Sequence, residues 1–265
     1  MSTFNLRLKQ IILQKKHNIC IGMDPDPNRL PKGYVKNPYG IYDFLKDVIQ
    51  YTYTYTIAYK FNLAFYFSLG PPGIEILNQI LKELYDKSST DKKILIADAK
   101  IGDIENTAKH YAYAYFEIWN FDAITLNPFM GFDAIKPFLE YSNKGCFILC
   151  LTSNPSNKDF EFYGDPPLFK KIAKKIYEWN QINDNLMAVV GATNQKSQLL
   201  EIKNILQDIP VLVPGVGAQG GDFRTIKEIF GKLALINIGR GILYSSQERD
   251  LLKIRIQEYL EQMEQ

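Results

Sequence analysis

Eight short apolar runs, most of them rich in β-branched residues, recur along the chain and alternate with longer segments of mixed polarity. The runs cover residues 18–24, 56–62, 93–100, 122–127, 146–154, 186–194, 211–218 and 233–241. Continuous apolar runs are typical of strands buried on both faces of a parallel sheet. Segments long enough for one helix each lie between them, including 43–53, 74–87, 104–119, 169–181, 194–207 and 223–230. Eight βα units favour a closed (β/α)8 barrel over an open doubly wound sheet.

The length of 265 residues fits one barrel of this kind, although length alone also allows two small domains. No stretch rich in Pro, Gly or Ser is long enough to link two domains. We therefore predict an α/β fold, a single (β/α)8 TIM barrel domain over residues 1–265 with an N-terminal helix. Residues 25–42 and 154–168 are interpreted as loops over one face, and most of each Tyr-rich tract, 51–56 and 111–116, as part of the preceding helix.

Charge and cysteine content exclude several classes of protein. The net charge is +2, and the basic residues are spread along the chain instead of forming the patch typical of nucleic-acid binding. Cationic residues interrupt the N-terminal stretch "MSTFNLRLKQIILQKK" before it reaches signal-peptide length, and no window approaches the ~20 apolar residues of a membrane span. Three cysteines without CxxC spacing indicate reduced, buried thiols: Cys20, Cys146 and Cys150. We predict a cytoplasmic protein with no nucleic-acid or membrane partner.

Polar side chains follow the predicted strands, at the end where (β/α)8 barrels place their chemistry. They are Asp24, Lys60, Asn62, Asp98, Lys100, Asn127, Ser153, Asn154, Thr193, Asn194, Gln219 and Arg240. A lone Asp or Asn after a strand is usually a turn residue or a helix cap. On this basis a structural role is the favoured interpretation for Asn127, Thr193 and Asn194, over ligand binding.

Asp98 and Lys100 are two residues apart on one strand, so alternation of side chains predicts that both face the same side. Lys60 ends the neighbouring strand, and Asp103 adds a second carboxylate. An opposite-charge contact at about 4 Å is worth about 4 kcal/mol at an effective dielectric near 20, and a like-charge contact costs as much. An alternating Lys-Asp-Lys-Asp arrangement is therefore favoured, either as a catalytic site or as an ion-pair network that seals the barrel.

Glycine-rich turns follow the last two strands, in "PGVGAQGGD" and "NIGRG". Barrels often bind phosphate with these two loops, because glycine lets backbone N–H groups approach an anion, and Arg240 can pair with it. The ligand is therefore predicted to carry a phosphate. Only His17 and His110 are present, so histidine acid–base chemistry and a multi-histidine metal site are not indicated. Lysine is left as the proton donor.

The stretch "DAKIGDIENTA", residues 98–108, resembles the signature of the orotidine 5′-monophosphate decarboxylases. Five further motifs agree in order along almost the whole chain: "IGMDPD", "YKFN", "TSNP", "VPGVGAQGGD" and "NIGRGI". The long loop after the first strand is similar to the longer subfamily found in some bacteria and protozoa. The resemblance implies conversion of orotidine 5′-monophosphate to uridine 5′-monophosphate and CO₂, the last step of de novo pyrimidine synthesis, with no metal or organic cofactor.

The resemblance also implies roles for individual residues. Lys60, Asp98 and Lys100 would form the catalytic charge array, with Lys100 as proton donor, completed by Asp103 from the partner subunit of a homodimer. The implied substrate-binding residues are Asp24, Asn62, Ile104, Thr107, Thr152, Ser153, Pro214, Gln219, Gly239 and Arg240.

Among these, Thr107 would reach across the dimer interface toward the ribose, Asp24 and Asn62 would contact the ribose or neighbours of the array, and Ser153 the pyrimidine edge. Gln219 would contact base and phosphate, and Gly239 with Arg240 the phosphate. It stays open which of Thr152 and Ser153 reads the base, whether Asp98 destabilises the bound substrate or orients Lys100, and whether a separate orotate phosphoribosyltransferase docks on the chain.

Two other functions remain. Related barrels with an Asp-x-Lys-x-x-Asp motif decarboxylate or condense sugar phosphates with magnesium, but these need acidic ligands at further strand ends. The second alternative function is a barrel that binds a phosphorylated ligand without catalysis. The intact Lys-Asp-Lys-Asp set argues against this alternative.

Overall fold

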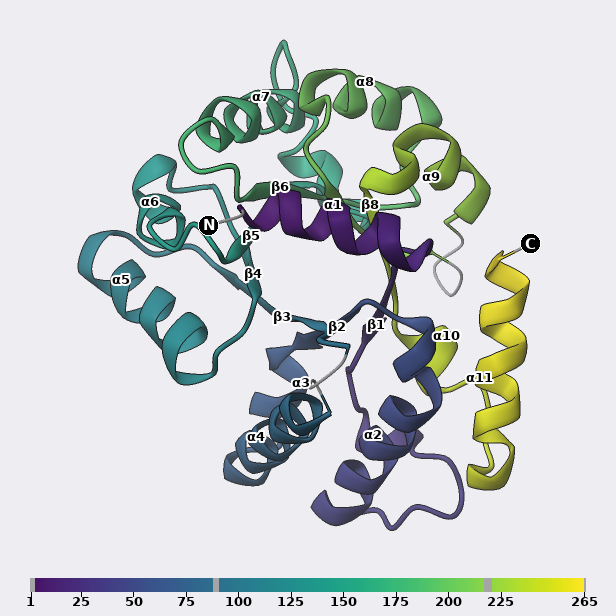
Figure 1. The fold of residues 1–265 in the computed structure, drawn as a ribbon. Helices are drawn as coiled ribbons and strands as arrows, with labels where there is room; N and C mark the ends of the chain where they lie inside the picture. Colours follow the sequence, from purple (N-terminus) through teal and green to yellow (C-terminus); the bar gives the residue numbers. More distant parts are fainter. Residues whose placement is uncertain (1–2, 88–90, 217–220, 265) are drawn as a thin grey trace. The chain divides into compact units, whose positions relative to one another are not determined.

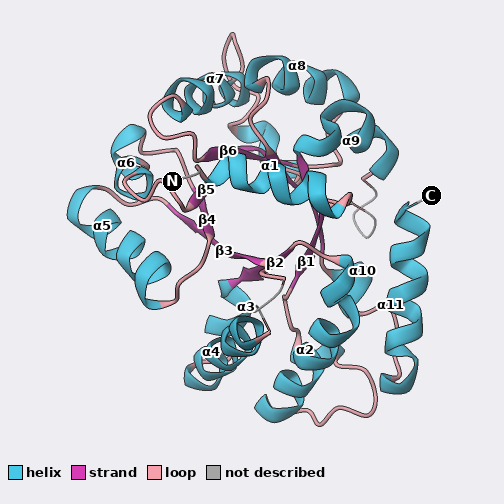
Figure 2. Cartoon of the chain, viewed as in Figure 1, coloured by secondary structure: helices cyan, strands magenta, loops and turns pink. Residues whose placement is uncertain are grey.

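The computed structural model describes residues 3–87, 91–216 and 221–264. Within these residues eight strands close into a barrel in the order β1 to β8, with helices between them (Figure 2). The strands are β1 (Ile19–Gly22), β2 (Ala58–Asn62), β3 (Ile94–Ile101), β4 (Ala123–Leu126), β5 (Gly145–Leu151), β6 (Leu186–Val190), β7 (Val211–Pro214) and β8 (Ala234–Ile238). Each falls on one of the apolar runs, so the predicted (β/α)8 TIM barrel is confirmed.

The α-helices include all six segments that the sequence predicts. They are α1 (Phe4–Lys15), α2 (Pro38–Thr52), α3 (Leu63–Phe67), α4 (Pro71–Asp86), α5 (Glu105–Tyr113), α6 (Lys136–Leu139), α7 (Leu168–Asn180), α8 (Lys196–Leu206), α9 (Phe223–Phe230), α10 (Arg240–Leu243) and α11 (Arg249–Glu264). Of those not predicted, α3, α6 and α10 are too short to show a helical period. The longer α11 buries Leu252, Ile256 and Leu260 at four-residue spacing, a helical pattern that is visible in the sequence.

Short 3₁₀ and π turns complete the secondary structure: η1 (Pro27–Arg29), η2 (Tyr53–Tyr55), η3 (Ala114–Ile118, π-helical), η4 (Phe132–Ala134), η5 (Pro155–Asp159) and η6 (Gly231–Leu233). Both Tyr-rich tracts are helical, as predicted, since α2 continues into η2 and α5 into η3. The predicted loop 25–42 ends early, because Asn37 caps the backbone N–H of Gly40 and Pro38 begins α2.

Backbone contacts group the chain into two compact units, which are described separately. The first unit combines Met1–Asn18 with Ala99–Asn237, and the second combines Ile19–Asp98 with Ile238–Gln265. The boundary passes through β3, between Asp98 and Ala99. That residues 1–265 form one domain stays a prediction.

In the second unit, β1, β2 and the first part of β3 pair in parallel, with Gly22 opposite Lys60 and Asn62 opposite Asp98. Helix α2 packs on α4 and α11 (Figure 1), and its apolar face is fully buried, including Phe44, Leu45 and Val48. The parallel register places the carboxyl ends of β1 and β2 at the same edge of the sheet, beside this core.

In the first unit, β4 to β8 pair in parallel, and α1 crosses the amino ends of these strands (Figure 1). Asn5 donates to the carbonyl of Leu186, at the start of β6, over 2.9 Å, and Arg7 forms a 3.2 Å ion pair with Asp122, just before β4. Phe4 and Leu8 of α1 are buried. The N-terminal helix is confirmed, and it covers the strand ends opposite to those that carry the motifs.

None of the helices in the ranges that the structure covers has both the length and the apolar character needed to cross a bilayer. Cys20, Cys146 and Cys150 are buried free thiols, as predicted, and burial raises the pKa of each.

Candidate active site

A buried ion pair lies at the carboxyl ends of β2 and β3 in the second unit. Lys60 Nζ donates to Asp98 Oδ2 over 2.6 Å, and their side chains are only 5% and 10% exposed. The register explains the contact, because Lys60 lies two residues before Asn62, which is paired with Asp98. Burial alone would lower the pKa of Lys60, but attraction to Asp24 and then Asp98, with the hydrogen bond to Asp98, holds it above its ordinary value. Lys60 is therefore a cation in the neutral pH range.

Asp24, just after β1, belongs to the same cluster. Its Oδ1 accepts from the backbone N–H of Asn62 over 3.1 Å, which ties the end of β1 to the end of β2. A methyl group built on Gly239 would lie 3.8 Å from Asp24 Oδ2. The second unit thus brings together four predicted site residues, Asp24, Lys60, Asn62 and Asp98, with Gly239 beside them.

The predicted phosphate motif of β8 forms the start of α10. Arg240 is the first residue of α10 and is exposed, and the carbonyl of Gly239 accepts from the N–H groups of Ile242 and Leu243. The hydroxyl of Tyr244, directly after α10, accepts from the N–H of Asp26 over 2.6 Å. Arg240 is therefore available to a ligand on a helix that is linked to the β1 loop.

The first unit carries the second half of the signature motif. Lys100 is exposed and has a left-handed backbone, with φ of +51°. The prediction of regular side-chain alternation through Lys100 is wrong, because alternation requires extended φ. The N–H of Lys100 donates to the hydroxyl of buried Thr125 over 3.0 Å, which supports this conformation.

Asp103 lies beyond β3, and its Oδ1 accepts from the N–H of Ile104 over 2.8 Å. Ile104 is 40% exposed, Glu105 again has a left-handed backbone, and Thr107 is exposed in the first turns of α5. Asp103, Ile104 and Thr107 therefore lie on one short exposed segment of the first unit.

Thr152 and Ser153 follow β5, and neighbouring side chains hold their backbone. The carboxylate of Glu161 accepts from the N–H of Thr152, and the amide groups of Asn157 and Asn194 donate to its carbonyl over 2.8 and 3.1 Å. Any side chain on Gly191 would collide with Ser153, since a Cβ there would lie 2.7 Å from Ser153 Cβ. The strand end is thus fixed as a rigid turn.

Three further strand-end residues make the hydrogen bonds that a structural role predicts. Asn127 accepts from the N–H of Phe129 over 3.0 Å, Thr193 donates to the carbonyl of Ser153, and Asn194 donates to that of Gly191. Of the β7 residues, Pro214 ends the strand and is part-buried, whereas Gln219 lies outside the described residues. Its predicted contacts to base and phosphate stay a prediction.

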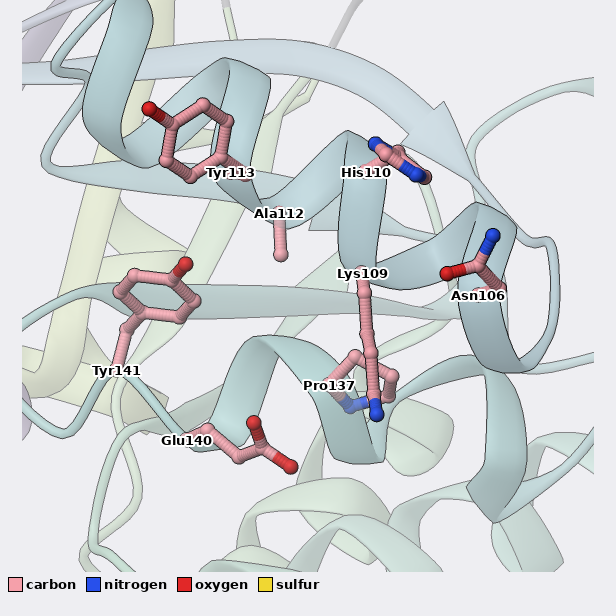
Figure 3. Close-up of a pocket in the computed structure, with 8 residues that line it drawn as sticks. All are labelled: Asn106, Lys109, His110, Ala112, Tyr113, Pro137, Glu140 and Tyr141. Atoms are coloured by element: carbon pink, nitrogen blue, oxygen red, sulfur yellow. The ribbon is translucent and has the colours of Figure 1, made fainter.

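A separate hollow of about 410 Å³ lies between α5 and α6 (Figure 3). Its lining is Asn106, Lys109, His110, Ala112, Tyr113, Pro137, Glu140 and Tyr141. None of the predicted site residues lines it. Among the described residues there is also no group of three or more His, Cys, Asp or Glu side chains placed to hold a metal ion.

Sequence reasoning missed three residues that shape the site: Thr125, Glu161 and Tyr244. Thr125 is a buried hydroxyl inside an apolar strand, a signal that could have been noticed. Glu161 and Tyr244 act through contacts with Thr152 and Asp26 that no local pattern contains.

The fold and these side chains define the class of the protein, a (β/α)8 barrel with a charged site at its strand ends and a Gly-Arg turn after β8. The model of the orotidine 5′-phosphate decarboxylase / HUMPS family matches residues 17–253. The chain belongs to this family, and the predicted resemblance is confirmed.

Named relatives agree with this assignment. The chain is 40% identical over 249 residues to an orotidine 5′-phosphate decarboxylase of Dehalococcoides mccartyi, covering 90% of this chain and 88% of the relative. It is 40% identical over 247 residues to the enzyme of the same name from Herpetosiphon aurantiacus, covering 92% and 90%. A Toxoplasma gondii crystal structure, provisionally named orotidine-monophosphate-decarboxylase, has a TM-score of 0.85 and 31% identity, covering 97% of this chain and 94% of that one.

Proposed function

We propose that this chain decarboxylates orotidine 5′-monophosphate to uridine 5′-monophosphate and CO₂, the last step of de novo pyrimidine synthesis. The family and the relatives of this name support the activity. The observation that carries it is the buried Lys60–Asp98 pair at 2.6 Å, in a chain whose motif continues with Lys100 and Asp103. A costly buried charge pair at a strand end is more readily explained by a site that acts on charge than by stability, since such pairs add little stability.

The chemistry requires stabilisation of a localised negative charge. When the bond from C6 of the pyrimidine to the carboxylate breaks, its electron pair stays on C6, where no adjacent carbonyl delocalises it. In the proposed mechanism Lys100 opposes this charge by fixed electrostatics and then transfers a proton from Nζ to C6. Lys60 holds Asp98 in place as its counter-charge, and Asp98 faces the leaving carboxylate.

Binding of the remote phosphate would assemble this charged site. Gly239 and Arg240 are proposed to bind the phosphate, with Gln219, while Asp24, Asn62 and Thr107 contact the ribose. Ser153 is proposed to read the base, and Ile104 and Pro214 to line the substrate. Remote contacts raise turnover only where their energy is realised in the transition state, so the phosphate is expected to affect kcat as well as KM.

We also propose that the enzyme is a homodimer in which Asp103 and Thr107 complete the partner's site. Ile104 of the segment that carries them is 40% exposed, and Phe129 and Met130 in the same unit are 85% and 53% exposed. Large apolar side chains exposed to this degree support a protein interface in this unit. A separate orotate phosphoribosyltransferase, the class of enzyme that would supply the substrate, stays a predicted partner, and co-purification of the two proteins tests this prediction.

The buried reduced cysteines support the cytoplasm as the location of the protein.

The test is loss of orotidine 5′-monophosphate absorbance by the purified protein, with and without EDTA. We expect equal rates under both conditions, because the proposed mechanism uses no metal. A rate that EDTA abolishes and Mg²⁺ restores would favour the alternative function, a magnesium-dependent barrel with the Asp-x-Lys-x-x-Asp motif that acts on sugar phosphates. No turnover at all would favour a binding protein.

A further inference from the structure

Glu161 lies in the loop between η5 and α7, and all of its polar groups are engaged. Its N–H donates to the carbonyl of Asn157 over 2.8 Å, and its carbonyl accepts from the N–H of Phe169 over 2.9 Å. Its part-buried carboxylate reaches back to Thr152 at the end of β5. Glu161 is thus the residue that joins this loop, the start of α7 and the end of β5.

The carboxylate of Glu161 forms two hydrogen bonds with Thr152. Glu161 Oε2 accepts from the backbone N–H of Thr152 over 2.8 Å, and Oε1 lies 2.7 Å from its hydroxyl oxygen. Two contacts to one residue fix both its peptide plane and its χ1 angle. Burial raises the pKa of Glu161 above its ordinary value, although the two hydrogen bonds from Thr152 act in the opposite direction.

The hydroxyl of Thr152 is already engaged within the protein, and its single proton is taken. Besides Glu161 Oε1, it lies 2.6 Å from Asn154 Oδ1. A hydroxyl has one proton and cannot donate to both oxygens. The two contacts are compatible when the Asn154 amide turns its NH₂ toward the hydroxyl, which leaves the hydroxyl proton for Glu161. Thr152 is then engaged as donor and acceptor within the protein.

The hydrogen bonds to Thr152 also orient Ser153, the next residue. The carbonyl of Thr152 accepts from Asn157 and Asn194, so the peptide that joins Thr152 to Ser153 is held on both sides. The carbonyl of Ser153 accepts from Thr193 over 3.3 Å. A Cβ on Gly191 would lie only 2.7 Å from Ser153 Cβ, so the Ser153 side chain is fixed between its held peptide and the backbone of Gly191.

We propose that Glu161 is a positioning residue, which holds Thr152 so that Ser153, and not Thr152, contacts the base of a pyrimidine nucleotide. This inference rests on the proposed function and assigns base recognition within it. Glu161 touches no ligand and acts through Thr152 and Ser153.

The experiment compares two ligands, uridine 5′-monophosphate and ribose 5-phosphate, by calorimetric titration. Glu161→Ala is expected to weaken binding of the nucleotide about tenfold, as expected for one misplaced hydrogen bond, and to change ribose 5-phosphate binding by less than about twofold. Ser153→Ala should give the same selective loss. The double variant should lose no more than Ser153→Ala alone, since Glu161 acts through Ser153.

Two variants complete the series. Glu161→Gln should retain most of the nucleotide affinity, because its oxygen accepts from the N–H of Thr152 while its NH₂ donates to the hydroxyl. Glu201→Ala is the matched control in the same unit: Glu201 pairs with Lys170 over 2.9 Å at 44% exposure, so neither ligand should be affected. If Glu161→Ala does not fold, Glu161→Asp, which shortens the side chain by one methylene, serves for the same comparison.

Equal losses for both ligands in Glu161→Ala, with normal binding by the wild type, would overturn the inference alone. So would a double variant whose losses add, or a Ser153→Ala that binds the nucleotide normally. Failure of the wild type to bind uridine 5′-monophosphate would instead overturn the proposed function, and this inference with it.

Discussion

Removal of Lys60 should destabilise the protein far more than removal of an exposed lysine. Lys60→Ala leaves Asp98, only 10% exposed, without the ammonium group that lies 2.6 Å away. Removing one partner of a buried ion pair costs about 3–5 kcal/mol, because an uncompensated charge stays buried. Asp24 loses the same counter-charge, so the upper part of this range is expected.

Lys46→Ala is the matched control in the same unit. Lys46 lies 3.6 Å from Glu83, with the two side chains 50% and 28% exposed. Exposed pairs of this kind contribute about 0–1 kcal/mol. Urea unfolding at pH 7, followed by circular dichroism, should therefore separate the two variants by several kcal/mol in the free energy of unfolding.

The pH dependence provides a second check. In the wild type the pKa of Lys60 is raised above its ordinary value of 10.5, so its stabilising contribution is fully present below that value and is lost only at higher pH. The stability deficit of Lys60→Ala should therefore be full at pH 7 and should shrink only as the pH rises above that ordinary value. A deficit as small as that of Lys46→Ala, or one that does not change with pH, would refute the reasoning.

Three further variants test the proposed roles. Lys100→Ala should keep the fold and nucleotide binding but lose essentially all turnover, and more than a few per cent of wild-type kcat in the purified variant would contradict its role as proton donor. Arg240→Ala should raise KM strongly, yet both it and the wild type should be about equally poor on substrate without phosphate; a variant further impaired on that substrate shows that Arg240 acts elsewhere. Mixing Lys100→Ala with Asp103→Ala homodimers should restore about a quarter of wild-type activity, since about half the dimers are mixed and each has one intact site. If mass tags confirm subunit exchange and no activity returns, Asp103 serves the site of its own chain.

The sequence could predict features that depend on local pattern and on neighbouring strands. The apolar runs mark every strand, and the Lys60–Asp98 pair follows because the ends of adjacent parallel strands meet. The structural roles of Asn127 and Asn194 also follow from ordinary turn chemistry. Pattern reasoning is reliable here because each of these features is decided within a few residues or one strand pairing.

Other features depend on contacts that sequence spacing does not contain. The left-handed backbone of Lys100 is unfavourable for lysine and is supported by Thr125, which comes 25 residues later. Glu161 returns to Thr152 through a loop, and Tyr244 reaches Asp26 across 218 positions. The position of a charged group could therefore be predicted, but its supporting contacts could not.

The crossing of α1 under the strands of the first unit constrains the order in which the chain can fold during synthesis. Asn5 binds the carbonyl of Leu186, 181 positions further on, and the apolar face of α1 has no partner in its own unit before Ala99. At a synthesis rate of about 5–20 residues per second, the apolar face of α1 stays uncovered for roughly ten seconds or more, until the strands that it packs on leave the ribosome. Substitution of Phe4 or Leu8 by a polar residue should therefore lower both the stability of the folded protein and the binding of chaperones to the nascent chain at this helix.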